Sequence, residues 1–368
     1  MAVSISGKTS KERQKTIAEG IKPYLLVSSP FSVWEPVEKM DYRVGRSTRC
    51  LTANDVESRY VQGRYPKSDM HILRAVHSYG YSTLQAVSKL LEYWKTKEEE
   101  ESRISGRPAL CIPVSDNHSL WGRLTSLCHE GVLVCHQYFA NEEYRNKYEE
   151  DKSRYRSIFN VNGIGVGMYK TVLQDGTISY DTRLQYLNEE EVFRRVMNGN
   201  MTACFLSNPF LMGVRFSVVH SVSYKKINLL SVLKMSADGK ENSDSKVCKL
   251  ILESITVKTN PIVIKKDERI LWIKNRIKEL KLVLDDYRKE QPSYIIFCAE
   301  DAEGISYIAD CIKKVDINLF RYSLFTTGTI LEQKNAINQP EKLSECFLEF
   351  KIDDDLDIVG ATGYYFLD

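Results

Sequence analysis

The sequence predicts an α+β protein with two folded domains. Its 368 residues suffice for two hydrophobic cores, at about 100–200 residues per domain. Two amphipathic helix patterns follow one another over residues 68–97, and strand and helix patterns alternate over residues 262–325. We therefore expect an irregular arm over residues 1–66 and a helical domain over residues 67–156. An α/β domain with an acidic C-terminal segment is expected over residues 157–368.

The composition is typical of a soluble protein, because 43% of the residues are hydrophobic and 27% are charged. No apolar run approaches the roughly 18–20 residues that cross a bilayer, and the N-terminus lacks the apolar region of a signal peptide. We expect a cytoplasmic protein without a membrane partner. The chain has nine cysteines, which is an odd number, and their positions are scattered along the sequence. We therefore expect most of them to be reduced thiols.

The helical domain begins with two helices, over residues 68–79 and 82–97. Apolar residues recur on one face of each helix at spacings of three and four. Ser82 and Gln85 have the spacing of a capping box, which predicts that Ser82 is the N-cap of the second helix. The acidic run at residues 98–101 is expected to be a solvated helix end and loop.

A third helix is predicted over residues 117–130, followed by a strand over residues 132–139. One face is apolar, and the other is small, polar and basic. The polar residues that we expect to contact DNA from this helix are Asn117, His118, Arg123 and Ser126. Arginine and asparagine can pair bidentately with guanine and adenine in the major groove. The alternative is that this segment is simply an amphipathic helix with no role in DNA binding.

Together these elements resemble a winged helix–turn–helix domain. The string Arg123-Leu124-x-x-Leu127-x-x-x-Gly131-Val132-Leu133 is similar to the junction of recognition helix and wing in that class. The resemblance covers about 70 residues and implies that the third helix enters the major groove. About twenty residues separate the second and third helices, so a strand over residues 109–114 could join the wing sheet. Residues 141–156 would form a long wing or a connector. The same architecture also serves as a docking module for proteins.

The distal domain starts with strand patterns and continues as an alternation of strands and helices. The expected elements are strands 158–161, 166–172 and 178–180, helix 188–198, strands 216–222, 227–235 and 262–264, helix 267–289, strand 294–299, helix 302–314 and strand 318–325. Strand–helix–strand–helix–strand implies a parallel sheet core. The apolar stripe of helix 267–289 either covers this sheet or contacts a second subunit.

A winged helix followed by such a domain resembles the replication–relaxation family of plasmids and conjugative elements, whose distal domain is related to restriction-endonuclease-type nucleases. Those nucleases hold Mg²⁺ with an acid and a Glu-x-Lys motif. Here Val263 or Ile264 occupies the position of the glutamate, and Glu253 and Asp267 could replace it only if the fold brought them together. The resemblance therefore implies a degenerate, non-catalytic nuclease core, and a divergent metal-dependent nuclease is an alternative.

The distal domain also contains a basic stretch. Residues 225–289 contain sixteen Lys and Arg against nine Asp and Glu. We expect part of it to bind DNA phosphates. The residues are Lys265, Lys266, Arg269, Lys274, Arg276 and Lys278.

Six Cys and His side chains lie close together in the sequence, at Cys111, His118, Cys128, His129, Cys135 and His136. Zinc prefers such ligands, but the paired spacing of a structural zinc site is missing. We expect core packing here, and no metal or cofactor.

These observations predict a non-enzymatic protein that binds double-stranded DNA, and the resemblance to the replication–relaxation family implies a mobile element and a role in replication, transfer or transcription control. A second copy of the chain and other replication or mobilisation proteins are further expected partners. The main alternative is an interaction or scaffold protein that uses the winged helix for docking.

Overall fold

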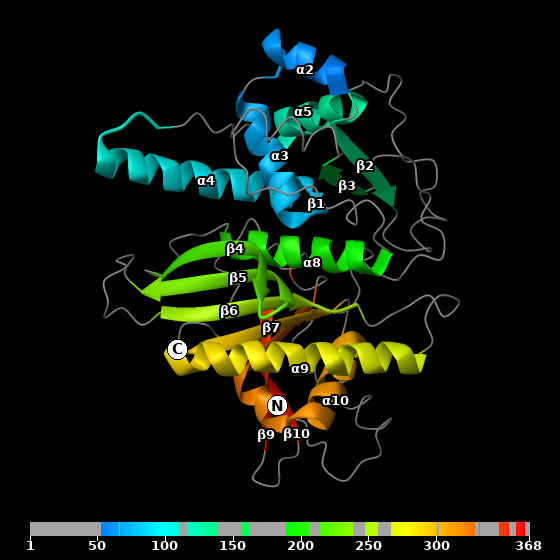
Figure 1. Ribbon diagram of the computed structural model, residues 1–368. Coiled ribbons are helices and arrows are strands. Elements are labelled where there is room, and N and C mark those ends of the chain that lie inside the picture. The colour runs from blue at the N-terminus through cyan, green and yellow to red at the C-terminus, as the bar shows by residue number, and fades with distance from the viewer. Residues whose placement is uncertain are drawn as a thin grey trace. The chain divides into compact units, whose positions relative to one another are not determined.

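The described residues fall into two compact units, which we call the helical unit and the sheet unit (Figure 1). The computed structural model describes residues 53–65, 67–109, 117–130, 132–138, 156–161, 189–206, 214–237, 247–256, 266–299, 302–327, 331, 346–352 and 358–364. The described residues up to 206 belong to the helical unit, and those from 214 onward belong to the sheet unit. The protein is therefore α+β, as the sequence predicts.

The helical unit combines helices with one small antiparallel sheet. Its elements are α2 (Ala53–Val61), α3 (Lys67–Tyr79), β1 (Ser82–Thr83), α4 (Leu84–Ser105), α5 (Asn117–His129), β2 (Leu133–Tyr138), β3 (Arg156–Val161) and α8 (Glu189–Leu206). The strand order in the sheet is β1-β3-β2, so β3 lies between two strands that precede it in the chain.

The prediction for α3 is confirmed, whereas that for α4 is wrong at both ends. Ser82 lies in β1, and the N-cap is Thr83, whose hydroxyl accepts a hydrogen bond from the Ala86 amide at 3.2 Å. Residues 98–101 are helical, because glutamate is a good helix former and the side chains of Glu99 and Glu101 are exposed to solvent. The helix ends at Gly106, whose φ of 69° is the left-handed conformation that suits glycine.

Two further expectations differ from the structure. Part of the expected N-terminal arm is the helix α2. The unit boundary lies near residue 207 rather than 156. The physical reason is that β3 pairs with β2 along six residues and α8 packs against α4, so both belong to the first core. The expected strands at 109–114, 166–172 and 178–180 and the wing at 141–155 lie outside the described residues, apart from Ala109 of the first.

The sheet unit contains a seven-stranded mixed sheet. Its elements are β4 (Val214–Tyr224), β5 (Ile227–Ala237), β6 (Val247–Ser254), α9 (Lys266–Glu290), β7 (Ser293–Ala299), α10 (Ala302–Val315), η4 (Ile317–Tyr322), β8 (Ser323–Thr327), β9 (Phe347–Ile352) and β10 (Ile358–Tyr364). The order is β10-β9-β8-β7-β6-β5-β4, with β6, β7 and β8 parallel to one another. A parallel core is therefore confirmed, with β7 and part of β8 among its predicted strands.

The strand that precedes α9 in this core is β6, which the sequence analysis did not identify. The expected strand at 262–264 lies outside the described residues. The expected strand at 318–325 begins as the 3₁₀-helix η4, where Asp316 accepts a hydrogen bond from the Asn318 amide and so caps the turn. Only its last residues join the sheet as β8.

The apolar stripe of α9 covers the sheet. Ile273, Ile277, Leu280 and Leu284 are all buried, and the helix packs against β7 and α10. Phe297 of β7 stacks on Phe325 of β8 at 5.6 Å, which continues the core between the parallel strands. The apolar stripe of α9 therefore packs within its own chain, as the first of the two expectations for this helix states. None of the helices in the described part is both long and apolar enough to span a membrane.

Replacing Thr83 by alanine should destabilise the helical unit. The substitution removes the cap of α4 and the hydrogen bond that the Thr83 hydroxyl donates to Asn200 Oδ1 at 2.8 Å. We expect a loss of about 1–2 kcal/mol in the free energy of unfolding, measured by urea denaturation. Thr83→Ser keeps the hydroxyl and should unfold close to the parent. Equal midpoints for Thr83→Ala and the parent would contradict this role.

Candidate nucleic-acid interface

The helix α5 is held in place by an apolar face. Leu120, Leu124 and Leu127 are buried at spacings of four and three, and the helix packs against α4 and β2. The Val132 amide donates a hydrogen bond to the Leu127 carbonyl at 2.9 Å, which closes the turn from the helix into β2. The helix is therefore fixed as a rigid element of the helical unit.

The opposite side of α5 faces solvent. Ser119, Trp121, Gly122 and His129 are exposed, and Trp121 retains 36% of its accessible surface. Apart from its chain neighbours and the backbone of α5 itself, nothing lies within 4 Å of the place where a Cβ on Gly122 would stand. A glycine inside a helix is unfavourable relative to alanine, and here no neighbour requires it. The surface around Gly122 is consequently open to close approach.

Arg123 has a structural partner. Its guanidinium forms a bidentate ion pair with Asp69 of α3, with Nε to Oδ1 at 2.7 Å and a second bond from Nη2 to Oδ2. Asp69 is only 1% exposed, whereas the Arg123 side chain is 30% exposed. The hydrogen bond to Asp69 raises the pKa of Arg123, against the opposing effect of burial. The pair joins α5 to α3 and occupies the guanidinium that we expected to contact a base.

The other expected base contacts lie at the start and middle of the same helix. Asn117 is the first residue of α5 and His118 the second, and their side chains are outside the described set. Ser126 is half-buried. Sequence reasoning missed Asp69, although an acid among the buried residues of α3 was the available signal.

The cysteine and histidine cluster divides between described and undescribed side chains. A hydrogen bond with Cys135 and burial both raise the pKa of Cys128, so this thiol is held neutral. His129 is exposed on the last turn of α5. The described part of the chain holds no group of three potential ligands that could bind a metal ion. The side chains of Cys111, His118 and His136 lie outside the described set.

The expected basic residues of α9 do not form one surface. Lys265 lies outside the described residues, and Lys266 begins α9. Lys278 is exposed and Lys274 is half-buried. Arg269 and Arg276 are 7% and 8% exposed. These two guanidiniums point into the sheet unit, which differs from the expected contact with phosphates.

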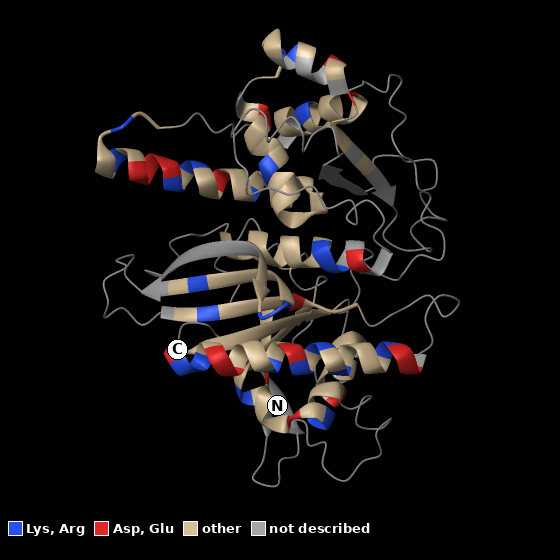
Figure 2. Cartoon of the chain, in the orientation of Figure 1, with Lys and Arg blue, Asp and Glu red and all other residues tan. Residues whose placement is uncertain are grey.

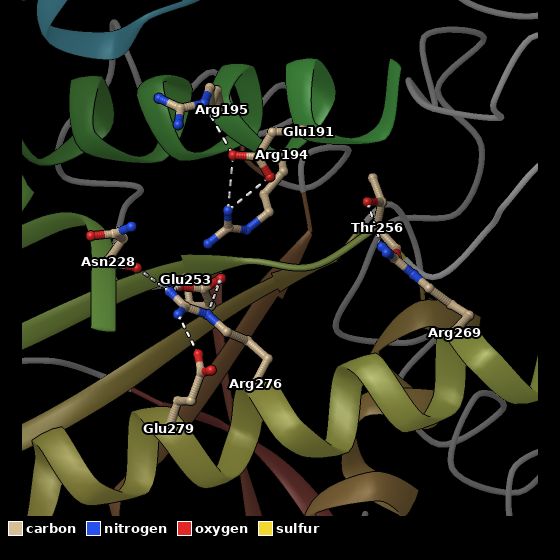
Figure 3. A network of polar contacts seen from close by, with 9 residues as sticks. All are labelled: Glu191, Arg194, Arg195, Asn228, Glu253, Thr256, Arg269, Arg276 and Glu279. Carbon is tan, nitrogen blue, oxygen red and sulfur yellow. Dashed lines mark hydrogen bonds and ion pairs between the residues drawn. The ribbon is translucent and has the colours of Figure 1, made fainter. Parts of the chain in front are cut away.

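Both arginines donate hydrogen bonds to acceptors within the sheet unit (Figure 3). Arg269 donates from Nε to the Thr256 carbonyl and from Nη2 to the Thr256 hydroxyl, each at 2.8 Å. Arg276 donates to Glu253 Oε1 at 3.2 Å and to Glu253 Oε2 at 2.8 Å. Its Nη2 also donates to the Asn228 carbonyl at 2.7 Å. One side chain thus connects α9 with β5 and β6.

This arrangement bears on the nuclease alternative. Glu253 is fully buried and paired with Arg276, while Asp267 is exposed at the start of α9. The two acids that could have replaced the missing glutamate therefore have different surroundings. A carboxylate already bonded to a guanidinium is poorly suited to hold Mg²⁺, since both compete for the same oxygens.

Comparison with family models, with curated proteins and with solved structures finds no match for this chain.

Replacing Arg276 by methionine should strongly destabilise the sheet unit. The substitution leaves the Glu253 carboxylate buried without its guanidinium partner. Breaking a buried pair in this way costs about 3–5 kcal/mol in the free energy of unfolding, which chemical denaturation measures. The double variant Glu253→Leu with Arg276→Met removes both charges and should recover much of that loss. A single variant as stable as the parent would contradict the importance of the pair.

Proposed function

We propose that this protein binds double-stranded DNA through the helical unit, with α5 as the recognition helix of a winged helix domain. The single observation that carries the proposal is the topology. The elements α3, β1, α4, α5, β2 and β3 follow one another as helix, strand, helix, helix, strand, strand, and the sheet order is β1-β3-β2. This order resembles that of a winged helix and supports the proposal that α5, the last helix before the paired strands β2 and β3, enters the major groove.

The surface of α5 supports this role. Its solvent side carries Ser119 and His129 as hydrogen-bonding groups, with Gly122 between them. An uncrowded glycine lets the helix backbone approach base edges closely. Arg123 acts through its ion pair with Asp69, which sets the position of α5 relative to α3. Asn117, His118 and Ser126 remain the proposed base contacts.

The sheet unit is proposed to act without catalysis. Candidates for phosphate contacts remain Lys274 and Lys278, because neither is buried. The side chains of Lys265 and Lys266 lie outside the described set, and these two lysines stay proposed contacts as well. The bonded state of Glu253 supports a degenerate nuclease-like core. A role in replication, transfer or transcription control of a mobile element follows from the resemblance to the replication–relaxation family.

A salt titration tests this function. Binding of the purified protein to a mixed-sequence duplex is measured by fluorescence anisotropy across salt concentrations, with and without Mg²⁺. We expect the logarithm of the affinity to fall linearly with the logarithm of the salt concentration, and the DNA to stay intact. Nicking that requires Mg²⁺ would favour the divergent nuclease. Absence of binding even at low salt would overturn the proposal and favour the docking module.

Substitutions at Gly122 separate folding from DNA contact. Gly122→Ala should raise the free energy of unfolding by about 1 kcal/mol, because alanine is the better helix former and its Cβ meets no atom. Gly122→Leu should fold equally well but weaken duplex binding about tenfold or more, a loss of about 1.4 kcal/mol. For each variant, urea denaturation measures the free energy of unfolding and fluorescence anisotropy measures the affinity for the duplex.

The matched control is Gln85→Leu, which places the same side chain on an exposed position of α4. It should leave duplex binding unchanged. If Gly122→Leu bound the duplex as tightly as the parent, α5 would not be the recognition helix.

A further inference from the structure

The turn between β4 and β5 has an unusual backbone for its residues. Lys225 and Lys226 form the two-residue turn and have φ angles of 46° and 70°. Hairpins of this length with two left-handed residues strongly prefer Asn-Gly, since a larger side chain is strained there. They are the only residues other than glycine with positive φ in the described part of the chain. The fold accepts two strained lysines at the tip of a hairpin, where both residues are exposed.

A single carboxylate holds several groups beside this turn. Asp286 of α9 accepts hydrogen bonds from Lys225 Nζ at 2.5 Å, from Lys289 Nζ at 2.7 Å and from the Tyr224 hydroxyl at 3.1 Å. The bond from Lys225, followed by that from Lys289, holds the pKa of Asp286 well below its usual range. One negative charge thus lies between two ammonium groups, so the group of three stays positive.

Aromatic rings lie among these charges. Tyr287 packs edge-on against Tyr224 at 5.3 Å, and Lys249 Nζ stands 4.1 Å above the Tyr287 ring. The Arg288 guanidinium lies 3.3 Å from the centre of the Tyr322 ring. The three rings are half-buried, so part of each remains accessible. Figure 2 shows the basic residues at this C-terminal end of α9.

We propose that this surface, the lysine–tyrosine patch, binds single-stranded nucleic acid. We define the patch as Lys225, Lys226, Arg288, Lys289, Tyr287 and Tyr322. Two of its four cations, Lys225 and Lys289, form ion pairs with the single acid Asp286, and Lys249 forms an ion pair with Glu290. Cations track a phosphate backbone, and adjacent half-exposed rings offer stacking surfaces for unpaired bases.

The combination favours a single strand over other polyanions. A duplex keeps its bases stacked inside, so the tyrosine rings would have no partner, and an acidic peptide offers no base to stack. Attraction to the helix dipole accounts for Arg288 and Lys289 at the end of α9, but not for the strained lysines of the turn. Lys226 in particular is exposed and forms no ion pair or hydrogen bond with any described residue.

This inference goes beyond the proposed function, because the patch belongs to the sheet unit and uses no residue of α5. The protein would then hold duplex DNA with one unit and an unpaired strand with the other.

The test uses the full chain, a labelled oligothymidine and a labelled duplex, with anisotropy read across salt concentrations. Lys226→Gly should lower the slope of log affinity against log salt for oligothymidine by about 0.7, the value for one phosphate contact on a single strand. Because glycine readily adopts the φ of 70°, the melting temperature should not fall. Lys226→Glu should weaken oligothymidine binding about tenfold, since it also adds a repulsive charge.

The control is Lys97→Glu, which makes the same change in net charge at an exposed position of α4. It should leave oligothymidine binding unchanged. Parental affinity and slope for Lys226→Gly, or an equal loss for Lys97→Glu, would overturn the proposal. A Gly122→Leu protein that loses the duplex but keeps oligothymidine shows that the two surfaces act separately. Failure of duplex binding alone would remove the winged helix function and leave the patch intact.

Discussion

The buried pair of Glu253 and Arg276 is the interaction on which the sheet unit depends. A carboxylate without accessible surface on β6 would be very unfavourable alone, so the fold must bring a cation to it. Arg276 supplies that cation from α9 and reaches the Asn228 carbonyl of β5 with the same guanidinium. The position of α9 across the sheet is therefore fixed by directional bonds as well as by its apolar stripe. The geometry also removes the one carboxylate of β6 from metal chemistry.

The helical unit uses the same principle at a smaller scale. Asp69 is buried on α3, and Arg123 reaches it from α5 with two hydrogen bonds. Arginine can form such a fork because its donors are planar and fixed. In a winged helix, the angle between the recognition helix and the rest of the domain decides which residues enter the groove. A residue that looks like a base contact in the sequence can thus serve recognition by positioning the helix.

The lysine–tyrosine patch follows a different logic, because it includes an element that lowers stability. Two lysines with positive φ are poor choices for a hairpin turn, and Asp286 holds only part of their charge. Strained residues tend to persist where the surrounding structure and function require them. Under the two proposals, the units contact nucleic acid in different ways, the helical unit by groove contact and the sheet unit by charge and stacking.

The sequence by itself determined the α+β class, the helices α3, α5, α9 and α10, and the parallel core, because periodic apolar spacing is a local property of the chain. It did not determine that β3 and α8 complete the first unit, since strand pairing joins residues far apart in sequence. Nor could it separate Lys278 on the surface from Arg276 in the core, because spacing along a helix does not show which basic residue meets a buried acid. The tertiary structure decided these points by pairing β3 with β1 and β2 and by placing Arg276 beside Glu253.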